Sequence, residues 1–304
     1  MHHAKNGRSN FNEKEGTLVK GCTGRLKRRV KNGDLLLVGC IMDCRSGAAV
    51  EMYHECGYDL VMIDREHTAL NSETILEHIR LARALDIPTM IRVADHSYHE
   101  FNRFLDQALD GIMVPRIRTR ADTEQVINTV KYPPLGQRGL GGSTCPVAKY
   151  LGWSKLGDQI DHVNNDLVVG IQIETAEALA NVDEILSVPG IDMAVVGNDD
   201  LSIGMGIPGQ FDSSEYLQAV ETVIAACRKH GVLPGIAGGD PTWVRYRHDK
   251  GMRVFWCAAD VISMWNATRN GIDAIRGRLA AEAAADLPFP AATVNAAKKL
   301  RYSK

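Results

Sequence analysis

The nine residues 59–67, DLVMIDREH, join a short apolar run directly to a cluster of charged side chains. A continuous apolar run of this length suits a strand that is buried on both faces, as in a parallel sheet. Charged residues immediately after such a strand need a partner or a ligand, because burying a lone charge costs free energy. We therefore expect Asp64, Glu66 and His67 to lie at the end of a parallel strand and to supply part of an active site.

The same pattern recurs along the chain and decides the fold class. Seven further apolar runs alternate with stretches of helical periodicity. These runs are 35–41 (LLLVGCI), 88–93 (PTMIRV), 110–114 (DGIMV), 167–173 (LVVGIQI), 191–196 (IDMAVV), 232–237 (VLPGIA) and 253–257 (RVFWC). Eight strand-then-helix units favour an α/β fold, a single-domain (β/α)8 TIM barrel, over an open doubly wound sheet.

Local signals predict where several helices begin and end. Asn71-Ser72 precedes an apolar stripe and predicts a helix start. Asp212, with Glu215 three residues later, resembles a capping box before a second helix. Glycines between a helix and a strand are expected in the left-handed conformation that ends helices, namely Gly57, Gly190 and Gly231.

The domain organisation follows from where this pattern starts and stops. We expect a flexible polar extension over 1–17, one barrel over 18–290 and a tail over 291–304. Within 18–31 a basic stretch suggests a solvated helix face, which we favour over a nucleic-acid patch. The connection 131–166 is too long for a turn and predicts a functional loop after the boundary of the fifth unit.

Bulk composition limits the class of partner. The 304 residues are 45% hydrophobic with a net charge of −2, which indicates neither a nucleic-acid nor a membrane partner and favours a small ligand. Seven scattered cysteines without zinc-site spacing suit a reduced, cytoplasmic setting. The N-terminal residues lack the apolar segment of a secretory signal, and no apolar run is long enough to span a membrane.

Acidic residues at the ends of strands five and six suggest a metal site. In a barrel of this kind catalytic groups cluster at the carboxyl ends of the strands. Glu174 and Asp200 occupy such positions, and two carboxylates without a Cys or His cluster suit Mg²⁺ or Mn²⁺. The alternative is that each carboxylate caps the following helix. Thr175 is itself a good cap, which leaves Glu174 free for another role.

The remaining polar residues at the strand ends suggest acid–base and anion-binding roles. His67 is within reach of Asp64, which would orient the imidazole for proton transfer, although His67 can also be a structural histidine. Arg92 can brace a barrel carboxylate or bind a substrate oxygen. The glycine-rich stretch 138–143 offers backbone N–H groups to an anion, but its spacing matches no phosphate-binding motif.

Four segments together carry a resemblance to a known family. YDLVMIDREH (58–67), YPPLGQRGLGG (132–142), VVGIQIET (168–175) and VVGNDDLS (195–202) resemble, in order and spacing, the signatures of the HpcH/HpaI aldolase family over residues 25–285. The resemblance implies a class II, divalent-metal-dependent aldolase that acts through the pyruvate enolate, with Co²⁺ a further option for the metal. No strand end carries a lysine, which argues against a Schiff-base mechanism.

The resemblance also implies roles for individual residues. Glu174 and Asp200 would bind the metal, with Gln172 beside them. Arg92 would stabilise the enolate oxygen, and His67, oriented by Asp64, would transfer protons. The pyruvate carboxylate would be held by the loop of Gly142 and Ser143 and by the backbone near Asp199. Family members are commonly hexamers, which implies a homo-oligomer in which 262–285 packs against neighbours.

Several positions depart from the family pattern and leave the reaction partner open. Arg65 stands where a small or neutral residue is usual, Asn198 replaces a proline, Ile41 replaces an aromatic residue, and the stretch 143–153 is unlike its counterparts. The first hypothesis is cleavage or formation of 4-hydroxy-2-oxo acids from pyruvate and an aldehyde. The second is a synthase that condenses a keto acid with an acyl-CoA or a second keto acid. The third is a non-catalytic barrel that binds an acidic metabolite or a partner, for which the basic stretch and Arg65 are the only support.

Overall fold

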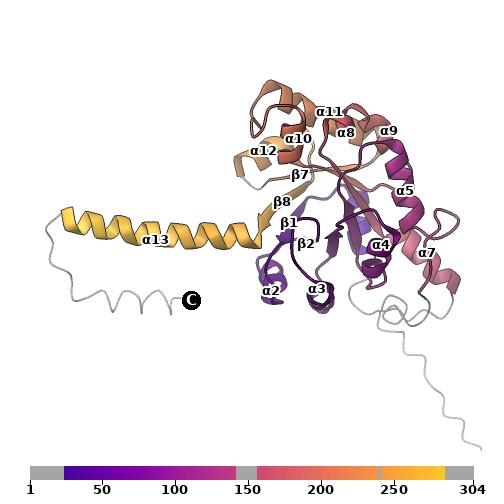
Figure 1. The fold of residues 1–304 in the computed structure, drawn as a ribbon, viewed down its shortest axis with the longest axis horizontal. Coiled ribbons are helices and arrows are strands. Elements are labelled where there is room, and N and C mark those ends of the chain that lie inside the picture. Colours follow the sequence, from indigo (N-terminus) through magenta and orange to yellow (C-terminus); the bar gives the residue numbers. More distant parts are fainter. Residues whose placement is uncertain (1–23, 142–155, 239–240, 285–304) are drawn as a thin grey trace, which may run out of the picture. The chain divides into compact units, whose positions relative to one another are not determined.

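The computed structural model contains a closed barrel of eight parallel strands, as predicted (Figure 1). The structure describes residues 24–141, 156–238 and 241–284. The strands, each paired with the next, are β1 (Leu36–Ile41), β2 (Leu60–Asp64), β3 (Thr89–Arg92), β4 (Gly111–Val114), β5 (Val168–Ile173), β6 (Met193–Val196), β7 (Leu233–Ala237) and β8 (Val254–Ala259). Every predicted apolar run forms a strand, and β8 closes the barrel against β1.

Helices follow the strands and form the outer layer of the barrel (Figure 1). They are α2 (Ala48–Glu55), α3 (Ser72–Ala84), α4 (Tyr98–Leu105), α5 (Arg120–Val130), α7 (Leu156–Asp166), α8 (Ala176–Ala180), α9 (Val182–Leu186), α10 (Asn198–Gly204), α11 (Ser214–His230) and α12 (Pro241–Lys250). A further helix, α1 (Arg25–Asn32), precedes the first strand, and α13 (Asp260–Ala284) follows the last.

The predicted helix boundaries are correct except at Asp212 and at Gly190, which lies three residues beyond Ser187, the C-cap of α9. The Asn71 side chain accepts a hydrogen bond from the Thr74 N–H at 2.9 Å and caps α3 as expected. The prediction of Asp212 as a cap is wrong: Ser213 caps α11, because its hydroxyl accepts from the Tyr216 N–H at 3.2 Å. The backbone has positive φ at Gly57, Gly190 and Gly231, with values of 81°, 105° and 69°.

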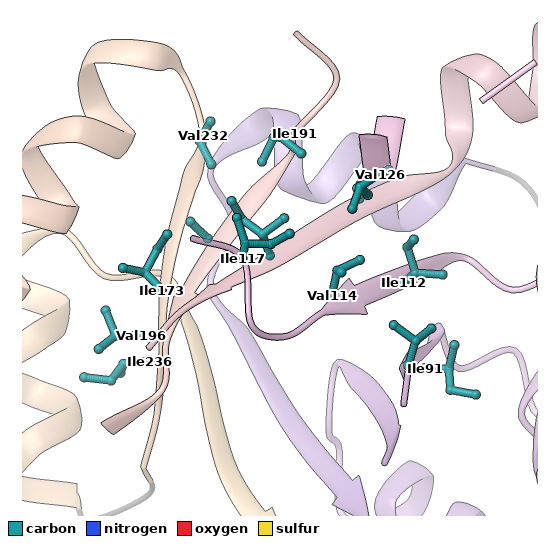
Figure 2. Close-up of a cluster of buried hydrophobic side chains, with 14 of the residues drawn as sticks. Ile91, Ile112, Val114, Ile117, Val126, Ile173, Ile191, Val196, Val232 and Ile236 are labelled. Carbon is teal, nitrogen blue, oxygen red and sulfur yellow. The ribbon is translucent and has the colours of Figure 1, made fainter. Parts of the chain in front are cut away.

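The core has two layers, which follow from the alternation of side chains along each strand. Outward-facing residues pack under the helices, and Figure 2 shows part of this cluster, including Ile91, Ile112 and Val126. Inward-facing residues form a second cluster inside the barrel, with Met62 and Met113 among its members. This alternation places the last inward position of each strand at the carboxyl end of the barrel interior.

The basic N-terminal helix contributes to the core, which corrects one prediction. Leu26 and Val30 of α1 join the interior cluster of the barrel. Lys27 is buried, and its amine lies 2.5 Å from a carboxylate oxygen of Asp192. The prediction of a solvated helix face is therefore wrong at Lys27, which is buried and pairs with a carboxylate that is distant in the sequence.

The chain divides into two compact units, Met1–Asp260 with the barrel and Val261–Lys304. The second unit contains most of α13, whose large apolar side chains are exposed, including Ile262, Trp265 and Ile275. No helix in the described ranges is both long enough and apolar enough to cross a membrane. The boundaries at 17 and 290 remain predictions.

Candidate active site

The polar residues at the carboxyl ends of β2, β3 and β5 belong to the inward-facing positions. In β2 the interior side chains are Leu60 and Met62, and the next inward position is Asp64. In β3 the same alternation leads to Arg92, which pairs in register with Asp64. The alternation in β5 leads to Gln172 and then Glu174. The strand period therefore brings these four side chains to one end of the barrel.

Asp64 and Arg92 form the most deeply buried ion pair of the site. The Asp64 Oδ1 atom accepts from Arg92 Nε at 2.8 Å, and Oδ2 accepts from Nη2 at 2.6 Å. Asp64 is fully buried and also accepts from the Glu66 N–H at 3.0 Å. The guanidinium lies over the ring of Trp256, 5.3 Å from its centroid. These contacts fix the Arg92 guanidinium in one orientation.

The structure corrects the predicted partner of His67. Both Asp64 oxygens accept hydrogen bonds from Arg92, and one of them also accepts from the Glu66 N–H, so Asp64 does not orient the imidazole. His67 Nε2 lies instead 3.5 Å from Glu66 Oε2, and its side chain is 55% exposed. Burial raises the pKa of Glu66, although the charges of Arg92 and His67 oppose the shift. The carboxylate behind the imidazole is therefore Glu66.

Arg65 has a bracing role that the sequence did not indicate. Its Nε donates to Glu100 Oε1 at 2.7 Å, and its Nη1 donates to the Leu70 carbonyl at 3.1 Å. Its guanidinium also lies over the ring of Phe104. These contacts tie the segment after β2 to α4, so the departure from the family pattern at Arg65 has a structural reason.

Glu174 is held at the end of β5 by two donors. Gln172 Nε2 donates to Glu174 Oε2 at 2.9 Å, and the Arg116 N–H donates to Oε1 at 2.6 Å. Gln172 in turn accepts from Arg92 Nη1 at 3.5 Å, so a hydrogen-bonded chain runs from Asp64 to Glu174. Thr175 caps α8 by accepting from the Ala178 N–H at 3.0 Å. Glu174 is therefore not a helix cap, in agreement with the reasoning from the sequence.

The carboxylates of Glu174 and Asp200 fit a divalent cation. Burial raises the pKa of Glu174, and the nearby charges of Glu66 and Asp200 raise it further, against the Arg116 hydrogen bond. A cation would relieve this repulsion. Asp200 lies in the first turn of α10, with a side chain that is 43% exposed. A Cβ added at Gly197, where β6 ends, would lie 2.8 Å from Glu174 Oε2, so this glycine allows the close approach of Glu174 to the start of α10.

The protein supplies only part of a coordination shell. In the ranges 24–141, 156–238 and 241–284, no group of three or more His, Cys, Asp or Glu is arranged to hold a metal. Mg²⁺ commonly binds through one or two carboxylates and completes its shell with water and substrate oxygens. The oxygen donors of Glu174 and Asp200 fit an ion of this type.

Two further predicted regions have different outcomes. Gly142 and Ser143 lie outside the described residues, and the described part of their loop passes α4, with Arg138 Nη2 donating to Asp106 Oδ1 at 2.7 Å. Asp199 is exposed in the first turn of α10, and its carbonyl accepts from Ser202 Oγ at 2.8 Å. The role of Asp199 in holding a carboxylate stays a prediction.

Asn198, which replaces the usual proline, joins two strand ends. Its Nδ2 donates to the Ala237 carbonyl at the end of β7, and its Oδ1 accepts from the Tyr216 hydroxyl. This departure from the family pattern therefore has a structural reason.

The sequence did not single out Arg116, which the structure places beside the carboxylates. It follows β4 with a φ of 60°, and its guanidinium lies 3.6 Å from Asp200 Oδ2. A signal was present in the sequence, since a basic residue follows the buried run DGIMV after a single proline.

Known proteins share this arrangement at the level of the whole barrel. The chain is 29% identical over 84% of its length to a hydroxypyruvate/pyruvate aldolase of Paraburkholderia phytofirmans, covering 98% of that protein. The crystal structure of an HpcH/HpaI aldolase from Desulfitobacterium hafniense superposes with a TM-score of 0.77 at 26% identity, covering 83% of this chain and 96% of that one. The crystal structure of the citrate synthase SbnG gives a TM-score of 0.74 at 27% identity, covering 83% and 98%.

The family described as HpcH/HpaI aldolase/citrate lyase matches residues 39–241, which include the end of β1, all of β2 to β7 and all the polar residues of the site described above. This match agrees with the resemblance seen in the sequence and with a carbon–carbon lyase. The chain belongs to the HpcH/HpaI aldolase/citrate lyase family.

Proposed function

We propose that this protein is a divalent-metal-dependent class II aldolase, which reversibly cleaves 4-hydroxy-2-oxo acids into pyruvate and an aldehyde. The observation that carries the proposal is the hydrogen-bonded chain from Asp64 through Arg92 and Gln172 to Glu174, which ends beside Asp200. The relatives named as aldolases support the same reaction class.

Glu174 and Asp200 would hold the metal, with Mg²⁺ or Mn²⁺ as the expected ion. When bound, the metal acts as a Lewis acid that stabilises the negative charge developing on the keto oxygen of the substrate. Glu174 is the more rigid of the two carboxylates, because Gln172 and the Arg116 N–H fix both of its oxygens.

Arg92 would bind the same oxygen of the substrate. Asp64 holds the Nε and Nη2 groups, which leaves Nη1 facing Gln172 and Glu66. A donor that is already oriented stabilises developing charge without reorganisation during the reaction. Asp64 is thus a positioning residue in this proposal.

His67 would accept the proton of the substrate 4-hydroxyl group during cleavage and return it during condensation. Glu66 Oε2 lies 3.5 Å from the imidazole Nε2, on the ring that would take up the proton. Gly142, Ser143 and the backbone near Asp199 remain the residues predicted to hold the pyruvate carboxylate.

Proton exchange on pyruvate tests the enolate mechanism without knowledge of the aldehyde. Purified protein with Mg²⁺ or Mn²⁺ should replace the methyl protons of pyruvate by deuterium in D₂O, as followed by proton NMR. Glu174→Gln should nearly abolish the exchange, whereas the exposed Glu177→Gln in the following helix should not. An unmodified, folded protein that fails to exchange with either metal contradicts the proposal.

The similarity to a citrate synthase favours one second candidate, a synthase that uses the same enolate. Such an enzyme would condense a keto acid with an acyl-CoA or with a second keto acid. Product analysis by mass spectrometry with oxaloacetate and an acyl-CoA separates the two reactions. A condensation product in place of pyruvate and aldehyde would support the synthase.

The exposed apolar side chains of α13 support assembly into a homo-oligomer. Ile262, Met264, Trp265 and Ile275 are each more than half exposed, with values of 56%, 65%, 67% and 58%. Exposed large apolar side chains often mark an interface. Light scattering should give a mass several times that of one chain, with a hexamer expected from the family resemblance.

A further inference from the structure

Arg116 occupies an unusual backbone conformation at the mouth of the site. It follows β4 and Pro115, and its φ of 60° lies in the left-handed region, which few residues other than glycine adopt. Its N–H donates to Glu174 Oε1 at 2.6 Å. The backbone is therefore fixed against one of the carboxylates of the site, and the long side chain starts beside the proposed metal ligands.

The guanidinium of Arg116 is available to a ligand. Its side chain is 49% exposed, and Asp200, its ion-pair partner at 3.6 Å, is itself 43% exposed. An ion pair between two exposed side chains contributes little, because water screens both charges. Within the described parts of the chain, the guanidinium donates no hydrogen bond, so its planar fork can still bind an anion through two parallel bonds.

Arg92 and Arg116 differ in the tasks that their surroundings permit. Arg92 is buried, and Asp64 neutralises its charge with two hydrogen bonds. Arg116 is half exposed, and the nearest described carboxylate to its guanidinium is that of Asp200 at 3.6 Å, which is also exposed. The inner arginine suits the keto acid next to the metal ligands, and the outer one suits a charge on the part of the substrate that extends towards solvent.

We propose that Arg116 binds an anionic group at the far end of the aldehyde, so that the enzyme prefers acceptors that carry a carboxylate. The inference rests on the proposed aldolase function and adds the substrate class of its second site. Arginine is well suited to this task, because its five donors match the two oxygens of a carboxylate in geometry.

A matched pair of acceptors tests the proposal. Condensation with pyruvate is measured with succinic semialdehyde and with butanal, which have the same number of carbons and differ in the terminal carboxylate. The measured quantity is the ratio of the two kcat/KM values. We expect Arg116→Gln to lower this ratio by about tenfold or more, the effect of about 1.4 kcal/mol of lost binding. Arg116→Lys should retain part of the ratio.

Two variants control for a general effect of charge at the mouth. Arg118→Gln removes an exposed cation from the same loop, and Arg45→Gln removes one from the loop after β1. Neither should change the ratio. The proposal is overturned if Arg116→Gln leaves the ratio unchanged, if it lowers both kcat/KM values equally, or if a control lowers the ratio as much.

Failure of this inference is distinguishable from failure of the proposed function. Deuterium exchange into pyruvate requires no aldehyde. If the unmodified protein exchanges and the ratio does not respond to Arg116→Gln, only the acceptor site is wrong. If exchange itself is absent, the aldolase proposal fails first.

Discussion

Replacing Asp64 by Asn should weaken both the fold and the reaction. Asp64 is fully buried and holds Arg92 through bonds of 2.8 and 2.6 Å. Asn keeps the shape and one acceptor, but it removes the charge and turns an NH₂ group towards a donor. Removing one partner of a buried ion pair costs about 3–5 kcal/mol, because the other charge stays buried without compensation. Glu66 lies 3.4 Å from the same guanidinium and offsets part of this loss.

We therefore expect Asp64→Asn to lower the free energy of unfolding by about 3 kcal/mol, the lower end of this range. The melting temperature should fall by about 6–12 °C, at roughly 2–4 °C per kcal/mol for a domain of this size. Urea unfolding followed by circular dichroism measures the first quantity, and a thermal scan measures the second. Deuterium exchange into pyruvate should slow by about 10- to 100-fold per folded molecule, as is common when a residue that orients a site is removed.

Glu100→Gln is the matched control, because it breaks the bond from Arg65 outside the chemistry. It should lower stability and leave the exchange rate per folded molecule nearly unchanged. The reasoning is refuted if Asp64→Asn costs less than about 1 kcal/mol, the range of exposed ion pairs. It is also refuted if both variants slow exchange equally.

Three further predictions concern separate features. Gly197→Ala should reduce Mg²⁺ affinity in calorimetry, because the added Cβ would lie 2.8 Å from Glu174 Oε2 and displace it; unchanged affinity contradicts this. His67→Gln should slow condensation by about 100-fold or more, while unfolding free energy changes by no more than about 0.5 kcal/mol because the side chain is exposed. Burial, and then the charge of Lys27, lower the pKa of Lys131 from 10.5 to about 7. Between pH 7 and pH 10.5 the unfolded chain therefore binds a proton at Lys131 that the folded chain has lost, so the free energy of unfolding rises with pH. The stability of Lys131→Met relative to the unmodified protein should therefore be greatest at or below pH 7 and decline towards pH 10, and a pH-independent difference in urea unfolding would contradict it.

The strands and the positions of the site were predictable because both follow from a local period. An apolar run buried on both faces identifies a strand, and its alternation identifies the inward end position. The partner of Asp64 was not predicted, although the necessary information was close at hand. Asp64 and His67 are near in sequence, but consecutive strand ends are nearer in space, and the register pairs Asp64 with Arg92.

Contacts between distant segments could not be predicted in this way. Lys27 is buried because its partner Asp192 lies at the start of β6, and a basic run in isolation gives no sign of that carboxylate. Arg116 likewise has a positive φ and donates its N–H to Glu174, which follows the next strand. Such contacts are set by closure of the barrel and have no local period.

Arg65 and Asn198 depart from the family pattern and brace the barrel, whereas Arg116 faces solvent. Arg65 is held by Glu100 and Leu70, and Asn198 is held by Ala237 and Tyr216. Lys27 in the basic helix is buried against Asp192, so the two features that favoured a non-catalytic binding barrel are each tied, at least in part, to contacts within the protein. Arg116 differs from both, because it is half exposed while its backbone is fixed to a residue of the proposed metal site. A charge held in that way suits the selection of a substrate. Mutation of Arg116, rather than of Arg65, should therefore alter the choice of acceptor.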